Sequence, residues 1–179
     1  MRDIMEVKFC PVCSEELVEK LIENVKRLAC PKDGCKYVFW NNPIPVVAGI
    51  VEVTSGIVLA HNRLWPPDVY SMITGFLECG ESPERGIARE IHEELGLKVQ
   101  VTNFVGIYPY AELNQIILVF HVKATGAISI KDEIDDFQIF SREDLKEWPF
   151  GQDKLAGWPF GAGWAIQDWL RACKNEKSE

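Results

Sequence analysis

Residues 75–97 read GFLECGESPERGIAREIHEELGL, and this stretch decides the fold. Ser82 is a favourable residue for capping the start of a helix, and Pro83 suits the first helical position. Gly96 stands where a helix commonly ends, because glycine adopts the left-handed backbone conformation without strain. We therefore expect a helix over residues 82–95.

One side of this helix is apolar and another is acidic. The apolar residues are four apart and should face the core: Ile87, Ile91 and Leu95. Glu90, Glu93 and Glu94 share another face, where their charges repel one another unless a cation lies among them. Carboxylate oxygens are the hard ligands that Mg²⁺ and Mn²⁺ prefer. The pattern predicts a divalent metal site or, as the simpler alternative, an ordinary acidic helix face in solvent.

The spacing of these residues resembles the Nudix box, G-x5-E-x7-R-E-U-x-E-E-x-G-U, in which U is apolar. Every specified position matches: Gly75, Glu81, Arg89, Glu90, Ile91, Glu93, Glu94, Gly96 and Leu97. The resemblance implies an α/β fold, the Nudix α/β/α sandwich, in which a mixed sheet lies between helices. It also implies a metal-dependent pyrophosphohydrolase, which cleaves the diphosphate of a nucleoside diphosphate linked to another moiety.

The resemblance assigns metal ligands within and beside the box. It implies that Glu90, Glu93 and Glu94 bind Mg²⁺ or Mn²⁺. A backbone carbonyl near the start of the box often adds a ligand, which here is that of Gly75 or Thr74.

The resemblance also implies residues that act beside the metal. Arg89 lies one turn before Glu93, can also reach Glu81, and should orient the carboxylates. Relatives place a further acid in a later loop, as a metal ligand or general base. Here the favoured residue is Glu133, with Asp136 and Glu112 as alternatives. The expected catalytic residues are Arg89, Glu93, Glu94 and Glu133.

Four of the six cysteines form two close pairs near the N-terminus: Cys10, Cys13, Cys30 and Cys35. In a chain without a recognisable secretory signal, paired cysteines at this separation are typical of a structural zinc site rather than of disulfides. The alternative is four incidental buried thiols. Cys79 and Cys173 stand apart and are expected to pack as small apolar residues.

The chain is expected to divide near residue 42. Residues 1–42 would form a small zinc ribbon with a turn near Glu23–Asn24, although residues 15–27 have weak helical propensity. Residues 43–179 would form the Nudix domain. In that domain strands are expected over 46–53, 57–60, 99–105, 115–123 and 138–140, with further helices after Ser141 and over 163–173.

Charge and hydropathy restrict the partners. The net charge of −8 argues against broad binding to nucleic acids or to membrane surfaces, which favour clustered Lys and Arg. No apolar run approaches the roughly 18 residues of a membrane-spanning helix, and no signal-peptide pattern is evident. A cytoplasmic protein that acts on a small nucleotide derivative is expected, and the resemblance allows a homodimer.

The ribbon and the segment after the box bear on the substrate. A four-cysteine ribbon before the box is similar to the zinc-ribbon Nudix group, which includes NADH, ADP-ribose and flavin-dinucleotide pyrophosphatases. The NADH enzymes carry S-Q-P-W-P-F-P-x-S soon after the box, whereas residues 105–112 here read VGIYPYAE. An ADP-ribose-like or FAD-like dinucleotide is therefore preferred. Tyr108, Tyr110 and Phe76 are candidates for stacking on a base, with core packing as the alternative for each.

A binding module is the second class of function to consider. Some Nudix domains sense nucleotides without cleaving them, and a zinc ribbon can bind nucleic acid. A sensor would usually have lost box carboxylates, and all of them are present here. Glu15, Glu16 and Glu19 oppose a nucleic-acid surface on the ribbon. The sequence therefore favours an enzyme.

Other potentially functional residues have structural interpretations. His61, His92 and His121 are expected to be non-catalytic. The motif Trp-Pro-Phe-Gly occurs twice, at 148–151 and 158–161. We expect its aromatic residues to anchor a loop against the core, with substrate stacking as the alternative.

Overall fold

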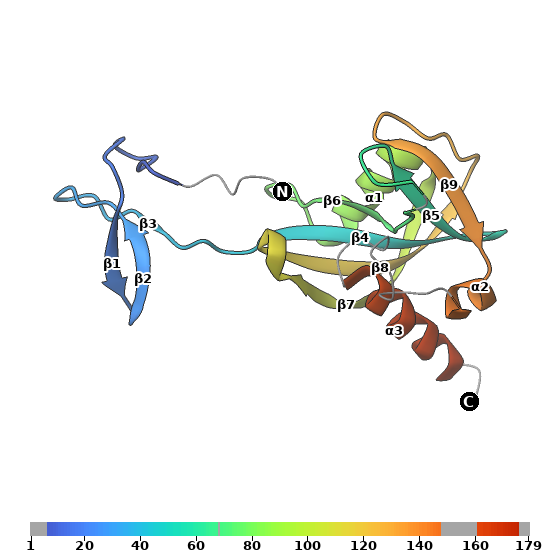
Figure 1. Cartoon of the computed structure of the whole chain (residues 1–179). Helices are drawn as coiled ribbons and strands as arrows, with labels where there is room; N and C mark the ends of the chain where they lie inside the picture. Colours follow the sequence, from blue (N-terminus) through green and yellow to red (C-terminus); the bar gives the residue numbers. More distant parts are fainter. Residues whose placement is uncertain (1–6, 68, 148–160, 176–179) are drawn as a thin grey trace. The chain divides into compact units, whose positions relative to one another are not determined.

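The structure is a computed structural model that describes residues 7–67, 69–147 and 161–175 of the 179-residue chain. It divides the chain into two compact units, Met1–Asn42 and Pro43–Glu179 (Figure 1). Within the described residues, no helix is long and apolar enough to cross a membrane. Both Trp-Pro-Phe sequences lie outside the described residues, so their expected role stays a prediction.

The first unit contains a three-stranded antiparallel sheet. Its strands are β1 (Val18–Ile22), β2 (Val25–Ala29) and β3 (Val38–Phe39), in the order β1-β2-β3. Glu23 and Asn24 have positive φ angles of 51° and 64°, as a two-residue hairpin turn requires. The expected ribbon and its turn are confirmed. Strand pairing overrides the weak helical propensity of this segment.

Few apolar residues are buried in the first unit. Its buried cluster consists of Cys10, Leu17 and Cys30, with partly buried residues packed around it. A unit of this size buries too little apolar surface to be stable on that basis alone, so it needs a cross-link or a metal. The cysteines therefore lie where such a cross-link would act.

The second unit is built on a mixed six-stranded sheet. Its strands are β4 (Ile44–Val53), β5 (Gly56–Asn62), β6 (Ile73–Phe76), β7 (Lys98–Tyr110), β8 (Gln115–Thr125) and β9 (Ile134–Phe140). The order is β7-β8-β4-β5-β9, and β6 pairs with β4 beside this path. Strands β4 and β8 are parallel, whereas the other pairs are antiparallel.

Helices cover both faces of this sheet. Figure 1 shows α1 (Pro83–Leu95) on one side, and α2 (Arg142–Glu147) with α3 (Gly161–Asn175) on the other. Side chains alternate along β4, so Val47 and Val51 join the core under α1. Ala48 and Ile50 join the core under α3. The expected α/β/α sandwich is confirmed.

Helix α1 follows the signals read from its sequence. Ser82 caps its first turn by accepting a hydrogen bond from the Arg85 N–H, and Gly96 ends it with a left-handed φ of 69°. The three apolar residues Ile87, Ile91 and Leu95 are fully buried. Each buried side chain of this size stabilises the fold by roughly 1.5–3 kcal/mol.

Several details differ from the sequence-based expectations. Strand β6 was not expected, because it is short, contains a glycine and is extended through pairing with β4. Strands β7 and β9 are longer than expected. Ser141 caps α2 as expected, since its hydroxyl accepts from the Asp144 N–H at 3.1 Å. The expectation for Cys79 was wrong: its side chain is exposed, whereas Cys173 packs against the core under α3.

Candidate active site

Gly75 allows α1 to lie close to strand β6. A Cβ atom on Gly75 would lie 1.9 Å from Cδ of Glu90, so any side chain there would occupy the space of that carboxylate. Pairing of Gly75 with Val47 holds this part of β6 on the sheet. The glycine thus lets Glu90 lie directly against the backbone of β6.

Arg89 holds three carboxylates together, including those of Glu81 and Glu93 as expected. Its Nε and Nη2 donate to Glu81 at 3.1 and 3.0 Å. Its Nη1 donates to Glu90 at 2.7 Å and to Glu93 at 3.0 Å, and Nη2 also reaches the Phe76 carbonyl. The hydrogen bonds to Glu81 are the main reason that the pKa of Arg89 is raised. The guanidinium is therefore fully engaged in orienting these acids.

The carboxylates around Glu94 have an excess of negative charge. Burial, followed by the charges of Glu90, Glu133 and Glu93, raises the pKa of Glu94 to about 8. Burial also raises the pKa of Glu90, although Arg89 acts in the opposite direction. Within the described part of the chain, Glu94 has no cationic partner. A divalent cation among these oxygens would remove the repulsion, so the donor set fits Mg²⁺ or Mn²⁺.

The segment before β9 brings Glu133 to this cluster. The backbone N–H of Lys131 donates to the Glu94 carbonyl at 3.1 Å, and that of Ser129 donates to the Leu95 carbonyl at 2.9 Å. Carbonyls in the last turn of a helix lack partners within the helix and are available for such contacts. The segment is thereby docked on the end of α1, with Glu133 near enough to raise the pKa of Glu94.

The two alternatives to Glu133 have other surroundings. Asp136 accepts hydrogen bonds from the Tyr70 hydroxyl and from the Phe137 N–H, which lower its pKa. Glu112 lies on the short 3-10 helix η1 (Ala111–Leu113), which follows β7. Among the three acids left open by the sequence, Glu133 is the one whose charge acts on the box glutamates.

Gly75→Ala is expected to weaken Mn²⁺ binding by about 10- to 100-fold, the usual effect of displacing a ligand's support. The added methyl group would displace the Glu90 carboxylate. Isothermal titration calorimetry of the purified variant would measure the affinity. Gly106→Ala is a matched control, because the nearest atoms to its methyl group would be those of the Tyr108 side chain, at 3.1 Å. Wild-type affinity in Gly75→Ala would contradict the prediction.

The three aromatic candidates do not gather at one site. Tyr108 is buried in the core under α3, and its hydroxyl donates to Asp168 at 2.9 Å. Tyr110 is partly buried against the same core. Phe76 is 55% exposed and directly follows Gly75. Phe76 is thus the exposed candidate of the three, and its backbone carbonyl accepts a hydrogen bond from Arg89.

Two of the histidines contact groups other than the glutamates of the box. His92 lies in the last turn of α1, and its Nδ1 is 3.4 Å from the Leu97 carbonyl. His61 lies on β5, where its Nδ1 contacts Asp135 at 2.5 Å. That contact raises the pKa of His61.

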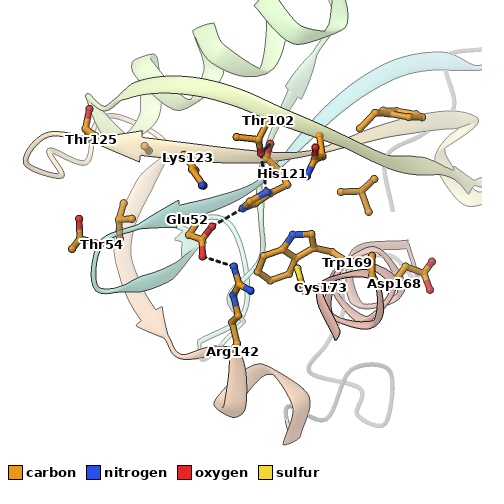
Figure 2. A pocket seen from close by; sticks show the side chains of 16 residues that line it. Glu52, Thr54, Thr102, His121, Lys123, Thr125, Arg142, Asp168, Trp169 and Cys173 are labelled. Atoms are coloured by element: carbon orange, nitrogen blue, oxygen red, sulfur yellow. Dashed lines mark hydrogen bonds and ion pairs between the residues drawn. The ribbon is translucent and has the colours of Figure 1, made fainter. Parts of the chain in front are cut away.

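His121 belongs to a polar network in a pocket on the side of α2 and α3. Its Nε2 contacts Glu52 at 2.8 Å, and Glu52 also accepts from Arg142 at 2.7 Å. Figure 2 shows Glu52 between these two side chains, with Trp169 beside them. The Arg142 guanidinium lies 4.8 Å from the Trp169 ring centre. Since Glu52 and Arg142 are 90 residues apart, no spacing in the sequence indicated this network.

This network is expected to make the protein less stable in acid. The pKa of His121 is lowered, mainly by burial, so protonating it below its ordinary value of 6.5 costs the folded state stability. Burial would raise the pKa of Glu52, but hydrogen bonds from Arg142 and His121 leave it lowered. The stabilisation from Glu52 is therefore lost as the pH falls below its ordinary value of 4.5.

Urea unfolding at neutral pH, at pH 6.5 and at pH 4.5 would measure this loss. As the pH is lowered, the free energy of unfolding should decrease more steeply in the wild type than in His121→Gln. Parallel pH curves for the two proteins would contradict the assignment to His121.

The four cysteines of the first unit bring their sulfurs together. The Sγ atoms of Cys10, Cys13, Cys30 and Cys35 lie within 4.8 Å of one another, and none is in a disulfide. The distances are 3.7 Å for Cys10–Cys35 and 3.5 Å for Cys13–Cys30. A tetrahedral zinc site with Zn–S bonds of about 2.3 Å has sulfur–sulfur edges of about 3.8 Å. The grouping thus has the size needed to hold one metal ion.

The two buried thiols of this group differ in acidity. Burial raises the pKa of Cys30 to about 12. Burial acts in the same direction on Cys10, but the backbone at Val12 and Cys13 outweighs it and lowers the pKa to about 7. A bound cation would stabilise both residues as thiolates.

Comparison with known families identifies the second unit. The model of the NUDIX domain matches residues 43–158. The chain belongs to the Nudix family. The resemblance seen in the box is thereby confirmed, and the Nudix match begins at the first residue of the second structural unit.

Two proteins of similar sequence have different names. The chain is 32% identical over 146 residues to the NAD-capped RNA hydrolase NudC of Pseudomonas aeruginosa. This match covers 79% of this chain and 50% of that protein. It is 28% identical over 153 residues to the ADP-ribose pyrophosphatase of Methanocaldococcus jannaschii, covering 82% and 84% of the two chains. The chain thus spans about half the length of the Pseudomonas relative.

A solved structure supports the same Nudix fold. The NUDIX hydrolase from Nitrosomonas europaea matches with a TM-score of 0.76 at 21% identity. The match covers 94% of this chain and 93% of the other. At this identity the likeness concerns the fold.

Proposed function

We propose that this Nudix protein is a metal-dependent pyrophosphohydrolase, which cleaves the diphosphate of a nucleoside diphosphate linked to another moiety. The observation that supports this is the carboxylate cluster at the end of α1. Glu90, Glu94 and Glu133 lie together, and burial, followed by the charges of Glu90, Glu133 and Glu93, raises the pKa of Glu94 to about 8. A site in which carboxylates outnumber their cationic partners is suited to a divalent cation and to the phosphates that it binds.

Glu90, Glu93 and Glu94 would hold Mg²⁺ or Mn²⁺, with the carbonyl of Gly75 as a further ligand. The bound metal would neutralise the diphosphate oxygens and make a water molecule more acidic. Arg89 keeps Glu90 and Glu93 oriented through direct hydrogen bonds. Glu133 would accept the proton of the attacking water, because it lies at the cluster on a segment docked to α1.

We propose zinc as the metal of the four cysteines. Their thiolates would complete its tetrahedron and leave no position open for a substrate. The ion would therefore stabilise the first unit rather than take part in hydrolysis. Its effect is largest where little apolar surface is buried, as in this unit.

ADP-ribose or FAD is the preferred class of substrate, with NADH as the less favoured member. The segment 105–112 lacks the motif of the NADH enzymes. The ADP-ribose pyrophosphatase relative matches over 84% of its own length, compared with 50% for the NudC protein. The NudC name keeps a capped RNA among the candidates, despite the acidic charge of this chain. Phe76 is the exposed residue among the three aromatic candidates and is proposed to stack on the base.

A substrate panel with product analysis tests this proposal. The zinc-loaded chain would be incubated with Mg²⁺ or Mn²⁺ and with ADP-ribose, FAD, NADH, NAD-capped RNA, diadenosine polyphosphates or nucleoside triphosphates. We expect ADP-ribose to give AMP and ribose 5-phosphate, or FAD to give AMP and FMN, with the highest kcat/KM. The highest kcat/KM for nucleoside triphosphates would contradict the substrate class. Nucleotide binding without any turnover would instead support a sensing module. The cytoplasmic location and the homodimer stay predictions.

A further inference from the structure

The segment that carries Glu133 is strongly acidic. Four of the five residues at 132–136 are acids, and one of them, Glu133, lies near enough to the glutamates of α1 for its charge to raise the pKa of Glu90 and Glu94. Like charges at such distances repel one another, most strongly where water is excluded. Docking this segment on α1 therefore requires contacts that offset the repulsion. The end of β5 and the connection between β5 and β6 supply them.

The first contact is to the backbone of Glu133 itself. Its carbonyl accepts a hydrogen bond from the Arg63 N–H at 3.0 Å. Earlier along the same segment, the N–H groups of Ser129 and Lys131 donate to carbonyls at the end of α1. Glu133 is thereby held between α1 and the residues that follow β5.

The second contact is between His61 and Asp135. The His61 Nδ1 contacts the Asp135 carboxylate, and its Nε2 contacts the Pro66 carbonyl at 3.1 Å. A carboxylate and a carbonyl are both acceptors, so both ring nitrogens must carry a proton for both bonds to form. The His61 side chain is only 13% exposed, and its ring packs near Trp65 and Tyr70. It thus brings a positive charge to the acidic segment in a defined orientation.

The third contact is between Tyr70 and Asp136. The Tyr70 hydroxyl donates to one carboxylate oxygen of Asp136, and the Phe137 N–H donates to the other at 2.8 Å. Asp135 and Asp136 are therefore both engaged by groups outside the carboxylate cluster. Glu133 is the acid of this segment whose charge raises the pKa of Glu94.

We propose that His61 and Tyr70 are positioning residues, which hold the segment of Glu133 against the end of α1 and so keep its negative charge beside the glutamates that bind the metal. The proposal rests on the proposed function only for the role of Glu133 in that site. Residues that support metal ligands typically change metal affinity or activity by about 10- to 100-fold when they are replaced.

Mn²⁺ binding to the zinc-loaded full-length chain, measured by calorimetry without substrate, tests this proposal. His61→Leu removes both N–H donors and should weaken Mn²⁺ binding by about 10- to 100-fold. His61→Asn keeps an N–H near the position of Nδ1 and should recover part of the affinity. Tyr70→Phe should cause a smaller loss. In turnover assays, kcat should fall in His61→Leu with little change in the KM for substrate.

A double-mutant cycle separates positioning from general destabilisation. If His61 acts through Glu133, His61→Leu should cause no further loss of Mn²⁺ affinity in a Glu133→Gln background. His121→Gln is the matched control, because it alters another histidine–carboxylate pair, in which His121 on β8 contacts Glu52 on β4. It should keep wild-type Mn²⁺ affinity.

Three results would overturn the proposal. The first is wild-type Mn²⁺ affinity in His61→Leu. The second is a loss of Mn²⁺ affinity from His61→Leu that is as large in the Glu133→Gln background as in the wild type, and the third is an equally large loss in His121→Gln. Mn²⁺ binding needs no substrate. A chain that binds Mn²⁺ but hydrolyses nothing would therefore contradict the proposed function and not the positioning role.

Discussion

Glu94→Gln is expected to lower kcat by about 10²- to 10⁴-fold, the range for loss of a group that acts directly in proton transfer or charge stabilisation. The reason is the place of Glu94 at the centre of the carboxylate cluster, where three other glutamates act on it. Glutamine has the same shape but cannot provide the negative charge that a divalent metal requires. The loss should appear with every substrate of the panel.

The metal-free fold should tolerate this change. Because the pKa of Glu94 is raised to about 8, its ionisation costs the folded protein stability as the pH rises from the ordinary value of 4.5. Glutamine removes that cost. In buffer without divalent metal, Glu94→Gln should unfold at a temperature equal to or above that of the wild type at neutral pH. Added Mn²⁺ should raise the Tm of the wild type more than that of the variant.

Steady-state kinetics and thermal unfolding would be compared with those of Glu84→Gln. Glu84 is an exposed residue in the first turn of the same helix, so its replacement should leave kcat nearly unchanged. Equal turnover by wild type and Glu94→Gln would remove Glu94 from the catalytic set. Unfolding of Glu94→Gln would show that its effect on kcat is structural.

Cys30→Ser is expected to release zinc and unfold the first unit, while the second unit keeps its fold. Cys30 is one of the four clustered sulfurs and belongs to the small buried core of that unit. Zinc binding contributes about 10–16 kcal/mol to the folding of small four-ligand domains, and removing one ligand sacrifices much of it. The two units have separate cores, so unfolding of one does not remove the core of the other.

Elemental analysis and limited proteolysis would measure this effect. We expect one zinc per chain in the wild type and rapid cleavage within residues 7–42 of Cys30→Ser. Cys79→Ser is the control, since this cysteine is exposed and lies outside the cluster, and it should retain zinc. A wild-type protein purified without chelator that contains no zinc would contradict the four-cysteine site.

The box helix was predictable because its signals are local. Ser82, Gly96 and the apolar residues of α1 act within a few residues of one another, and the helix Pro83–Leu95 lies within the predicted range. The hairpin at Glu23–Asn24 is local in the same sense. Strand β6 could not be predicted in this way, because only its pairing with β4 holds it extended.

The choice among the three late acids depended on packing rather than pattern. The resemblance favoured Glu133 over Asp136 and Glu112, but no spacing in the sequence places any of the three against the glutamates of α1. The hydrogen bond from Lys131 to the end of α1 decides which of these carboxylates lies near the cluster. Likewise, only the folded chain shows that Tyr108 on β7 is buried and that Phe76 on β6 is exposed.

The sequence by itself determined the family, the acids of the box and the grouping of four cysteines, because each depends on residues at fixed short spacings. The tertiary structure decided the contacts of His61 with Asp135 and of Tyr70 with Asp136, whose partners are 74 and 66 residues apart. Such contacts form only when the sheet brings β5 and β9 side by side. The residues that hold Glu133 at the site therefore became visible only in the folded chain.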